Sequence, residues 1–247
     1  MRALSARSVV LSLLLGAHPP ELPVSALVDA GEMFDIAEPT LRVALTRMVA
    51  NGDLERTDRT YRLSARLLER QRRQDQALEA AGPWDGRWEM VVVTSVGRSA
   101  ADRAGLRTEL SDLRLAELRE GVWMRPANLA RELPSWPEGL IRVFHGTPQN
   151  GTPQNGTPED EPDALVRRLW DLDGWNRAGL HLTEDIAAAR TASERLTVAA
   201  AVVRHLREDP ALPAVLLPAD WSAPALRSAY AAYQTELIGS GLALVVS

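Results

Sequence analysis

Residues 35–62 of this 247-residue chain read DIAEPTLRVALTRMVANGDLERTDRTYR, a helical pattern followed by a short alternating segment. In the first half, apolar residues recur at the spacing that places them on one face of a helix. These residues are Leu41, Ala44, Leu45, Met48 and Val49. Asn51-Gly52 follows as a helix stop, since both residues tolerate positive φ. The stretch therefore predicts an amphipathic helix with one buried face.

The segment after the stop predicts a hairpin. Alternating residues from Leu54 to Leu63 favour two short strands around a polar turn at Asp58-Arg59-Thr60. A helix whose outer face carries small residues and arginines can enter a major groove, because bulky side chains would hold it away from the bases. Residues 35–62 therefore have the pattern of a recognition helix and wing in a winged helix-turn-helix. An ordinary amphipathic helix followed by a hairpin is the alternative.

The local charge agrees with DNA binding, although the whole chain carries −5. Residues 36–73 contain nine arginines against five acidic residues, a local balance of +4. A local basic patch is what phosphate contact requires. The predicted DNA-binding residues are Thr40, Arg42, Val43, Thr46 and Arg47 on the helix and Arg56, Arg59 and Arg62 on the hairpin.

The bulk composition is that of a globular protein with two or three domains, at 45% hydrophobic and 25% charged residues. The chain has no cysteine, which excludes disulfides, a thiolate nucleophile and a cysteine metal site. This composition fits a reducing cytoplasm, so we expect a cytoplasmic protein. No segment approaches the roughly 18 apolar residues that a membrane helix requires, so no membrane partner is expected.

The first residues have two interpretations. Arg2 and Arg7 precede an apolar run from Val9 to Leu15, as in a secretory signal, but the run is short and no clear cleavage site follows. We prefer the first helix of the DNA-binding domain, packed on the recognition helix. Residues 22–34 then predict the second helix, and residues 63–80 a charged linker helix that completes a domain over 1–80.

Residues 81–146 predict a central domain of the β-α-β-β-α-β type, a ferredoxin-like order in an α+β protein. The expected strands are Trp88–Val96, Leu113–Arg119, Val122–Met124 and Leu140–Phe144, and the expected helices are Ser99–Leu110 and Pro126–Leu133. Residues 147–162 contain the repeat GTPQN-GTPQN-GTP, which has no apolar side chain to bury and predicts a flexible loop.

Residues 163–247 predict a helical C-terminal domain. Its helices are expected over Asp163–Leu172, after a cap at Thr183, over Ser193–Arg207 and from Ser222 onward. Asp171-x-Asp173-Gly174 is reminiscent of a calcium loop, but its glycine comes too early for an EF-hand.

The sequence contains no pattern typical of a catalytic or cofactor site. The four histidines are scattered without metal-ligand spacing, and phosphate, dinucleotide and nucleophile-elbow motifs are missing. We therefore expect no enzyme, no cofactor and no metal. A hydrolase or transferase, or a protein-interaction scaffold, remains an alternative, because a fold can assemble catalytic groups from distant positions.

Three stretches of the chain together resemble the PaaX-type family of transcriptional regulators, the phenylacetic-acid-degradation repressors. The first combines RSVVLSLLLG at 7–16 with TLRVALTRMVANG at 40–52. The second is GVWMRP at 121–126, and the third runs from DPALP at 209–213 through LLPADW at 216–221. The joint match is more specific than a helix-turn-helix pattern alone.

The resemblance implies a homodimeric repressor with a winged helix, a ferredoxin-like domain and a helical domain. It further implies release from operator DNA by an acyl-coenzyme A thioester such as phenylacetyl-coenzyme A. The central domain also resembles a small CRISPR-associated nuclease, but Val93-Thr94-Ser95 stand where that chemistry would need a carboxylate. We therefore interpret this domain as a dimerisation or sensing module.

An acyl-coenzyme A effector would need arginines for its phosphates and an apolar aromatic wall for its acyl group. Five residues around the second and third domains offer both kinds of side chain. They are Trp123, Arg125, Trp170, Trp175 and Arg177. We expect the effector to bind among them, although packing in a core is the usual role of a tryptophan.

Overall fold

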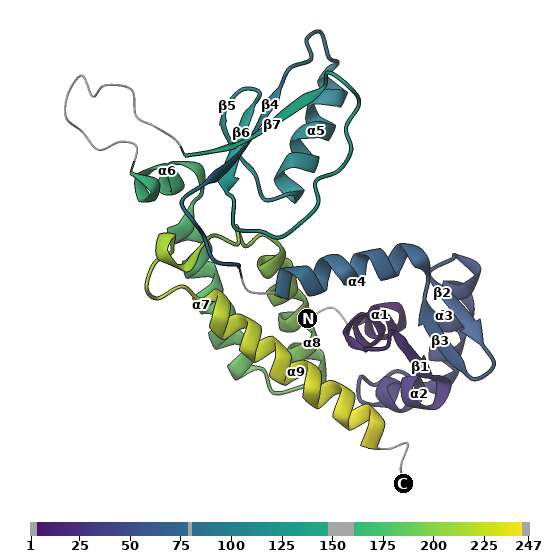
Figure 1. The fold of residues 1–247 in the computed structure, drawn as a ribbon. Helices are drawn as coiled ribbons and strands as arrows, with labels where there is room; N and C mark the ends of the chain where they lie inside the picture. Colours follow the sequence, from purple (N-terminus) through teal and green to yellow (C-terminus); the bar gives the residue numbers. More distant parts are fainter. Residues whose placement is uncertain (1–3, 79–80, 148–160, 244–247) are drawn as a thin grey trace, which may run out of the picture. The chain divides into compact units, whose positions relative to one another are not determined.

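The computed structural model describes residues 4–78, 81–147 and 161–243. Its contacts group the chain into two compact units, drawn as a ribbon in Figure 1. Unit 1 comprises residues 1–79, 177–207 and 222–247, and unit 2 comprises residues 80–176 and 208–221. The C-terminal segment that was expected to form one domain from residue 163 onward is thus shared between two units. The predicted GTPQN loop falls largely outside the described residues.

Unit 1 begins with a winged helix-turn-helix. Its elements are α1 (Ala6–Gly16), β1 (Glu21–Pro23), α2 (Val24–Glu32), α3 (Glu38–Ala50), β2 (Leu54–Thr57), β3 (Thr60–Leu63) and α4 (Ala65–Leu78). The strands form an antiparallel sheet in the order β1-β3-β2. The predicted helices and hairpin are confirmed, and α3 is the helix for which a recognition role was predicted. The short strand β1 is an addition, which pairs with residues 60–62 of β3 and adds a third strand to the hairpin.

Helix α3 forms where its sequence pattern predicted. Pro39 lies in its first turn, and Asn51 caps its carboxyl end, followed by Gly52 at φ 69°. Leu41 and Leu45 are fully buried on its inner face, against α1 and α2. Burial of each such leucine contributes about 1.5–3 kcal/mol. The core of the unit thus fixes which face of α3 remains outside.

Part of α7 (Leu172–Ala188), α8 (Ala192–Arg207) and α9 (Ala223–Ala243) complete unit 1. Helix α9 contacts α1, α2 and α8, and α8 contacts α4. The predicted cap at Thr183 is wrong, because α7 runs through this position and the Thr183 hydroxyl donates to the Gly179 carbonyl at 3.0 Å. The helix begins earlier, where the Asp171 carboxylate accepts the Gly174 N–H at 2.9 Å.

Unit 2 contains the predicted ferredoxin-like sheet. Its elements are β4 (Trp88–Val93), α5 (Ala100–Asp112), β5 (Ala116–Arg119), β6 (Val122–Pro126), β7 (Ile141–Gly146), α6 (Pro162–Leu169) and the 3-10 turn η1 (Ala214–Leu216). The strand order is β5-β6-β4-β7, and all neighbours are antiparallel. The expected helix at Pro126–Leu133 is wrong, since residues 127–137 contain no helix between β6 and β7.

The sheet of unit 2 is covered on both faces. Helix α5 lies beside the sheet (Figure 1), and its Leu106 and Leu110 pack with Val91 and Trp123 on one face. On the other face, Trp88 and Met124 pack against α6, the start of α7 and the segment around η1. Alternation along β4 and β6 thus distributes their apolar side chains between two cores.

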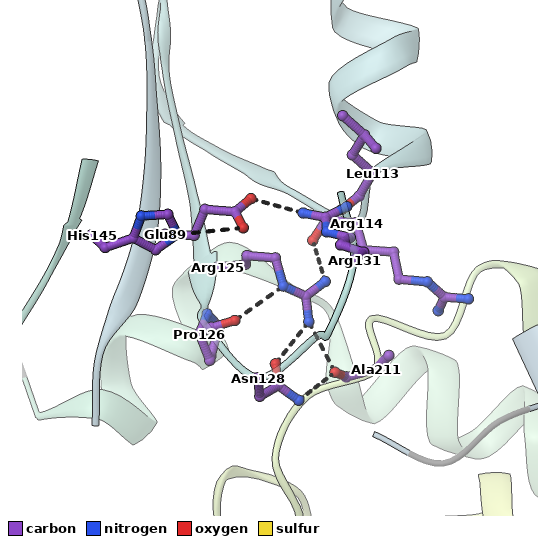
Figure 2. Close-up of polar contacts among 9 residues, drawn as sticks. All are labelled: Glu89, Leu113, Arg114, Arg125, Pro126, Asn128, Arg131, His145 and Ala211. Atoms are coloured by element: carbon purple, nitrogen blue, oxygen red, sulfur yellow. Dashed lines mark hydrogen bonds and ion pairs between the residues drawn. The ribbon is translucent and has the colours of Figure 1, made fainter. Parts of the chain in front are cut away.

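A buried arginine at the end of β6 holds the irregular β6–β7 connection in place. The fully buried Arg125 donates to the carbonyls of Pro126 at 3.1 Å and Arg114 at 3.2 Å. It also donates to Asn128 Oδ1 at 2.9 Å and to the Ala211 carbonyl at 3.0 Å (Figure 2). Burial and the nearby charge of Arg131 lower the pKa of Arg125 to about 9, so it remains protonated at neutral pH.

A second arginine fixes the same connection to the sheet. Arg131 donates to Glu89 Oε1 at 2.7 Å and to the Leu113 carbonyl (Figure 2). Desolvation lowers the pKa of Arg131, and the charge of Glu89 opposes this shift. The two arginines therefore connect this irregular segment to the sheet and to the chain around Ala211.

A buried carboxylate connects the elements of the winged helix. Asp53 is 4% exposed and lies directly after the stop of α3. Its Oδ2 accepts from Arg7 Nη2 at 3.0 Å and Nε at 3.2 Å, and its Oδ1 accepts from Arg66. Asp53 therefore ties the start of α1 and the start of α4 to the point where the wing leaves α3.

We expect Asp53→Asn to destabilise unit 1. The amide keeps the shape but loses the negative charge, and charge-assisted hydrogen bonds of this kind contribute roughly 1.5–3 kcal/mol. Urea unfolding followed by circular dichroism measures the loss. Asp58→Asn at the exposed wing tip is the matched control, because asparagine tolerates the positive φ of 39° found there. Equal stability of the two variants would contradict the role of Asp53.

We expect Arg125→Lys to destabilise unit 2. Lysine has a single ammonium centre and cannot reach all four acceptors, and a buried carbonyl left unpaired costs roughly 1–3 kcal/mol. The matched control is Arg119→Lys at an exposed position of β5. Thermal unfolding should show a lower midpoint for Arg125→Lys alone; an unchanged midpoint would mean that the network in Figure 2 adds little stability.

Candidate nucleic-acid interface

The outer face of α3 is exposed along its whole length. Thr40, Arg42, Val43, Thr46 and Arg47 are all exposed, while the apolar stripe on the opposite side is buried or half-buried. Val43 leaves 50% of its surface exposed although it is apolar. The structure therefore brings together on one surface the five helix residues that the sequence analysis selected.

The two arginines of this face have different surroundings. Arg42 Nε lies 2.6 Å from Glu38 Oε1, one turn earlier on the same helix. Arg47 forms no ion pair or side-chain hydrogen bond with any described residue. An exposed pair such as Arg42–Glu38 contributes little to stability, so Arg42 can exchange this carboxylate for a phosphate or base. Arg47 can bind a phosphate or base without first breaking a side-chain contact with a described residue.

The three wing arginines are also exposed. Arg62 Nη2 lies 2.6 Å from Glu55 Oε2, directly across the hairpin. The Arg56 guanidinium lies 5.9 Å from the centre of the Tyr61 ring. Arg59 occupies the turn, and within the described structure its side chain forms no ion pair. The wing thus presents three cations beside α3.

This arrangement can bind a polyanion whose surface carries hydrogen-bonding groups. Arginine bonds the guanine edge or a phosphate, threonine bonds either, and an exposed valine can contact a thymine methyl group. The small residues between the arginines allow the helix backbone to approach a groove. Helix α3 is fixed from behind by its buried stripe, so these groups are presented by a rigid support.

The residues expected to bind an effector are largely taken up by packing. Trp123 is buried against α5, and the donors of Arg125 are directed to backbone and amide oxygens of unit 2. Trp170 is half-buried against the other core, and Trp175 stacks on Trp221 with ring centres 4.3 Å apart. These contacts give the side chains structural roles, and their part in effector binding stays a prediction.

The fifth residue of that set, Arg177, is exposed and falls in unit 1, whereas the other four belong to unit 2. The structure therefore does not bring the five together within one compact unit. Its assignment to an effector site also stays a prediction.

The structural role of Asp53 was not predicted from the sequence, where it is one of five acidic residues in a basic segment. The sequence feature that could have indicated this role is its position directly after Asn51-Gly52, where the chain leaves α3. Asn128 was not predicted either, because its bond to the Ala211 carbonyl joins residues 83 positions apart in the sequence.

Neither a metal site nor a membrane helix is found in the parts of the chain that the structure describes. No group of three or more His, Asp and Glu side chains there is placed to hold a metal ion. The same residues include no helix that is long and apolar enough to cross a bilayer.

Comparisons with known proteins found matches to the winged helix and to the ferredoxin-like domain. A family model described as PaaX-like protein matches residues 5–67, and one described as the PaaX protein central Cas2-like domain matches residues 81–140. A solved structure, that of the uncharacterized protein Rv0674 from Mycobacterium tuberculosis, is 49% identical with a TM-score of 0.84. The alignment covers 97% of this chain and 98% of that chain. No curated protein matches.

Both family models lie on units of the described fold, one on the winged helix and one on the ferredoxin-like sheet. Identity at the level found with the mycobacterial protein, over nearly the full length of both chains, means that the two share a fold and a family. The chain belongs to the PaaX family of DNA-binding transcriptional regulators.

Proposed function

We propose that this regulator is a repressor that binds operator DNA through α3 and the wing. The observation that carries the proposal is the exposed outer face of α3, where the Arg47 side chain has no ion-pair or hydrogen-bond partner among the described residues. Helix α3 enters the major groove, where Arg42 and Arg47 contact bases or phosphates. Arg56, Arg59 and Arg62 contact the adjoining backbone.

The smaller residues of α3 complete this interface. Thr40 and Thr46 contribute hydroxyl groups close to Arg42 and Arg47, and Val43 supplies an apolar contact to the floor of the groove. The Thr46 hydroxyl donates to the Arg42 carbonyl at 3.0 Å, and its oxygen can still accept from a base amino group.

The repressor acts as a homodimer on a pseudo-palindromic operator. Two copies of α3 would enter successive major grooves about one helical turn, or 34–36 Å, apart. This arrangement doubles the number of base contacts, so a half-site alone should bind far more weakly than the full operator. Blocking a promoter in this way represses the genes behind it.

We expect Arg47→Ala to weaken operator binding by roughly 1–3 kcal/mol, or about 5- to 150-fold. The double variant Arg42→Ala, Arg47→Ala should bind still more weakly. Mobility-shift titration on the chain's own promoter measures both. The matched control is Arg103→Ala on α5, another exposed helical arginine, which should bind like the parent.

Salt dependence tests the same interface independently. The logarithm of the affinity should fall linearly with the logarithm of salt concentration, with a slope set by the phosphates contacted. Replacing a wing arginine such as Arg59 by alanine should reduce that slope by about one. Parental affinity in the double variant, or a flat salt response, would rule out α3 and the wing as the DNA-binding surface.

The proposed signal for release is an acyl-coenzyme A thioester, which the family resemblance supports. Such a molecule lowers operator affinity only if it binds the DNA-free conformation better than the DNA-bound one. The coupling is reciprocal, so operator DNA should weaken thioester binding by the same factor.

We expect one member of a panel of thioesters, including phenylacetyl-coenzyme A, to release the operator at micromolar concentration. Typical coupling energies of about 1–3 kcal/mol would lower the operator affinity roughly 5- to 150-fold. Fluorescence anisotropy of labelled operator DNA measures the release. Free coenzyme A is the control, and release by it at equal concentration would mean that the acyl group is not recognised.

A further inference from the structure

The carboxylate of Glu38 lies on the same exposed face of α3 as the predicted DNA-binding residues. Glu38 occupies the first turn of the helix, and Arg42 and Thr46 follow it at intervals of four residues, which places all three on one side. Glu38 and Arg42 keep 48% and 58% of their side chains exposed. Because a carboxylate repels phosphates, Glu38 opposes DNA binding unless it serves a contact of another kind.

Glu38 holds Arg42 through one nitrogen only. Arg42 Nε donates to Glu38 Oε1 at 2.6 Å, and neither Nη1 nor Nη2 of Arg42 has a partner among the residues that the structure describes. These two nitrogens form the end of the planar guanidinium, and each has an N–H that points away from Nε. The ion pair therefore restricts the side chain at Nε and leaves both Nη groups, the guanidinium fork, open to another acceptor pair.

Two other arginines of this surface have different arrangements. Arg62 donates to Glu55 Oε2 through Nε at 2.8 Å and through Nη2 at 2.6 Å, which occupies part of its fork. Arg47 has no side-chain partner in the described part of the chain, so no ion pair restricts its rotamer. Of these three, Arg42 alone combines an engaged Nε with an open fork.

We propose that Glu38 is a positioning residue, which orients the Arg42 fork toward a guanine in the major groove of the operator. Guanine presents two acceptors, O6 and N7, and a guanidinium fork bonds both at once. This contact uses Nη1 and Nη2, so the ion pair at Nε is retained in the complex. The inference rests on the proposed function, which places α3 in the major groove.

The charge of Glu38 favours a base contact of Arg42 over a phosphate contact. The Glu38–Arg42 pair has no net charge, so it attracts a phosphate less than an arginine without a carboxylate neighbour does. Hydrogen bonds to the neutral edge of guanine depend less on net charge. The pair also restricts Arg42 before DNA arrives, which reduces the conformational entropy lost on binding. Arg42 is therefore suited to specify a base.

A purely structural role of Glu38 would give a different result on mutation. A carboxylate in the first turn stabilises a helix through the helix dipole, and an ion pair between residues i and i+4 adds to this slightly. Loss of such stabilisation would weaken binding to every DNA sequence alike. Loss of a positioning carboxylate lowers the preference for guanine, and removal of its negative charge strengthens binding to unrelated DNA.

Mobility-shift titration of the full chain on its own operator, with each base pair substituted in turn, tests the proposal. The parent should prefer guanine at one position of each half-site by roughly 5- to 150-fold, the range for one bidentate contact. Arg42→Lys should abolish that preference, because an ammonium group lacks the fork.

Glu38→Ala should reduce the preference at the same position by about fivefold or more, while its binding to unrelated DNA is equal to that of the parent or tighter. Glu38→Gln keeps a neutral acceptor for Nε and should lie between the parent and Glu38→Ala. Glu55→Ala is the matched control, because Glu55 is also an exposed acid paired with an arginine of the same surface. It should leave the guanine preference unchanged.

An unchanged guanine preference in Glu38→Ala overturns the positioning role, as does a preference lost at a base pair that Arg42→Lys does not affect. A uniform loss of affinity for all DNA sequences also overturns it, since a structural role gives this result. In each of these cases, weak operator binding by the Arg42→Ala, Arg47→Ala double variant keeps the proposed function. Parental binding by the double variant overturns both.

Discussion

The winged helix depends on a buried carboxylate that several elements share. Asp53 bonds Arg7 and Arg66 through its side chain, donates its N–H to the Met48 carbonyl at 2.9 Å, and accepts the Ser64 N–H at 3.1 Å. Two cations satisfy one desolvated anion, and both keep most of their side chains in water. The stop of α3, the first helix and the linker helix are therefore fixed at one point, from which the wing departs.

Much of this unit could be predicted because its information is local. The spacing of Leu41, Leu45 and Met48 determines which face of α3 is buried, so the exposed face follows without further knowledge. Asn51-Gly52 ends the helix, and alternation over the next residues gives the hairpin. The candidate DNA-binding residues were identified for the same reason, since each belongs to one helix face or one hairpin.

The remainder depends on contacts that sequence periodicity does not contain. The segment after Pro126 has helical composition, but Arg125 and Arg131 bind carbonyls that are distant along the chain, and these bonds favour an irregular path. Thr183 resembles a cap, yet Asp171 starts the same helix three turns earlier. A cavity beside Tyr233 is lined by four helices from both ends of the chain, so no local sequence pattern predicts it.

Helix α1 belongs both to the locally encoded winged helix and to the long-range packing of α8 and α9. One side of it is part of the core behind α3, and its carboxyl end forms part of the cavity wall with α8 and α9. Gln71 of α4 donates to the carbonyls of Leu15 and Ala17, which holds that end of α1 in place. Packed interiors respond to small changes by discrete shifts, because close packing leaves little space for gradual ones. The position of α3 therefore depends on α1 and, through α1, on the packing of α8 and α9.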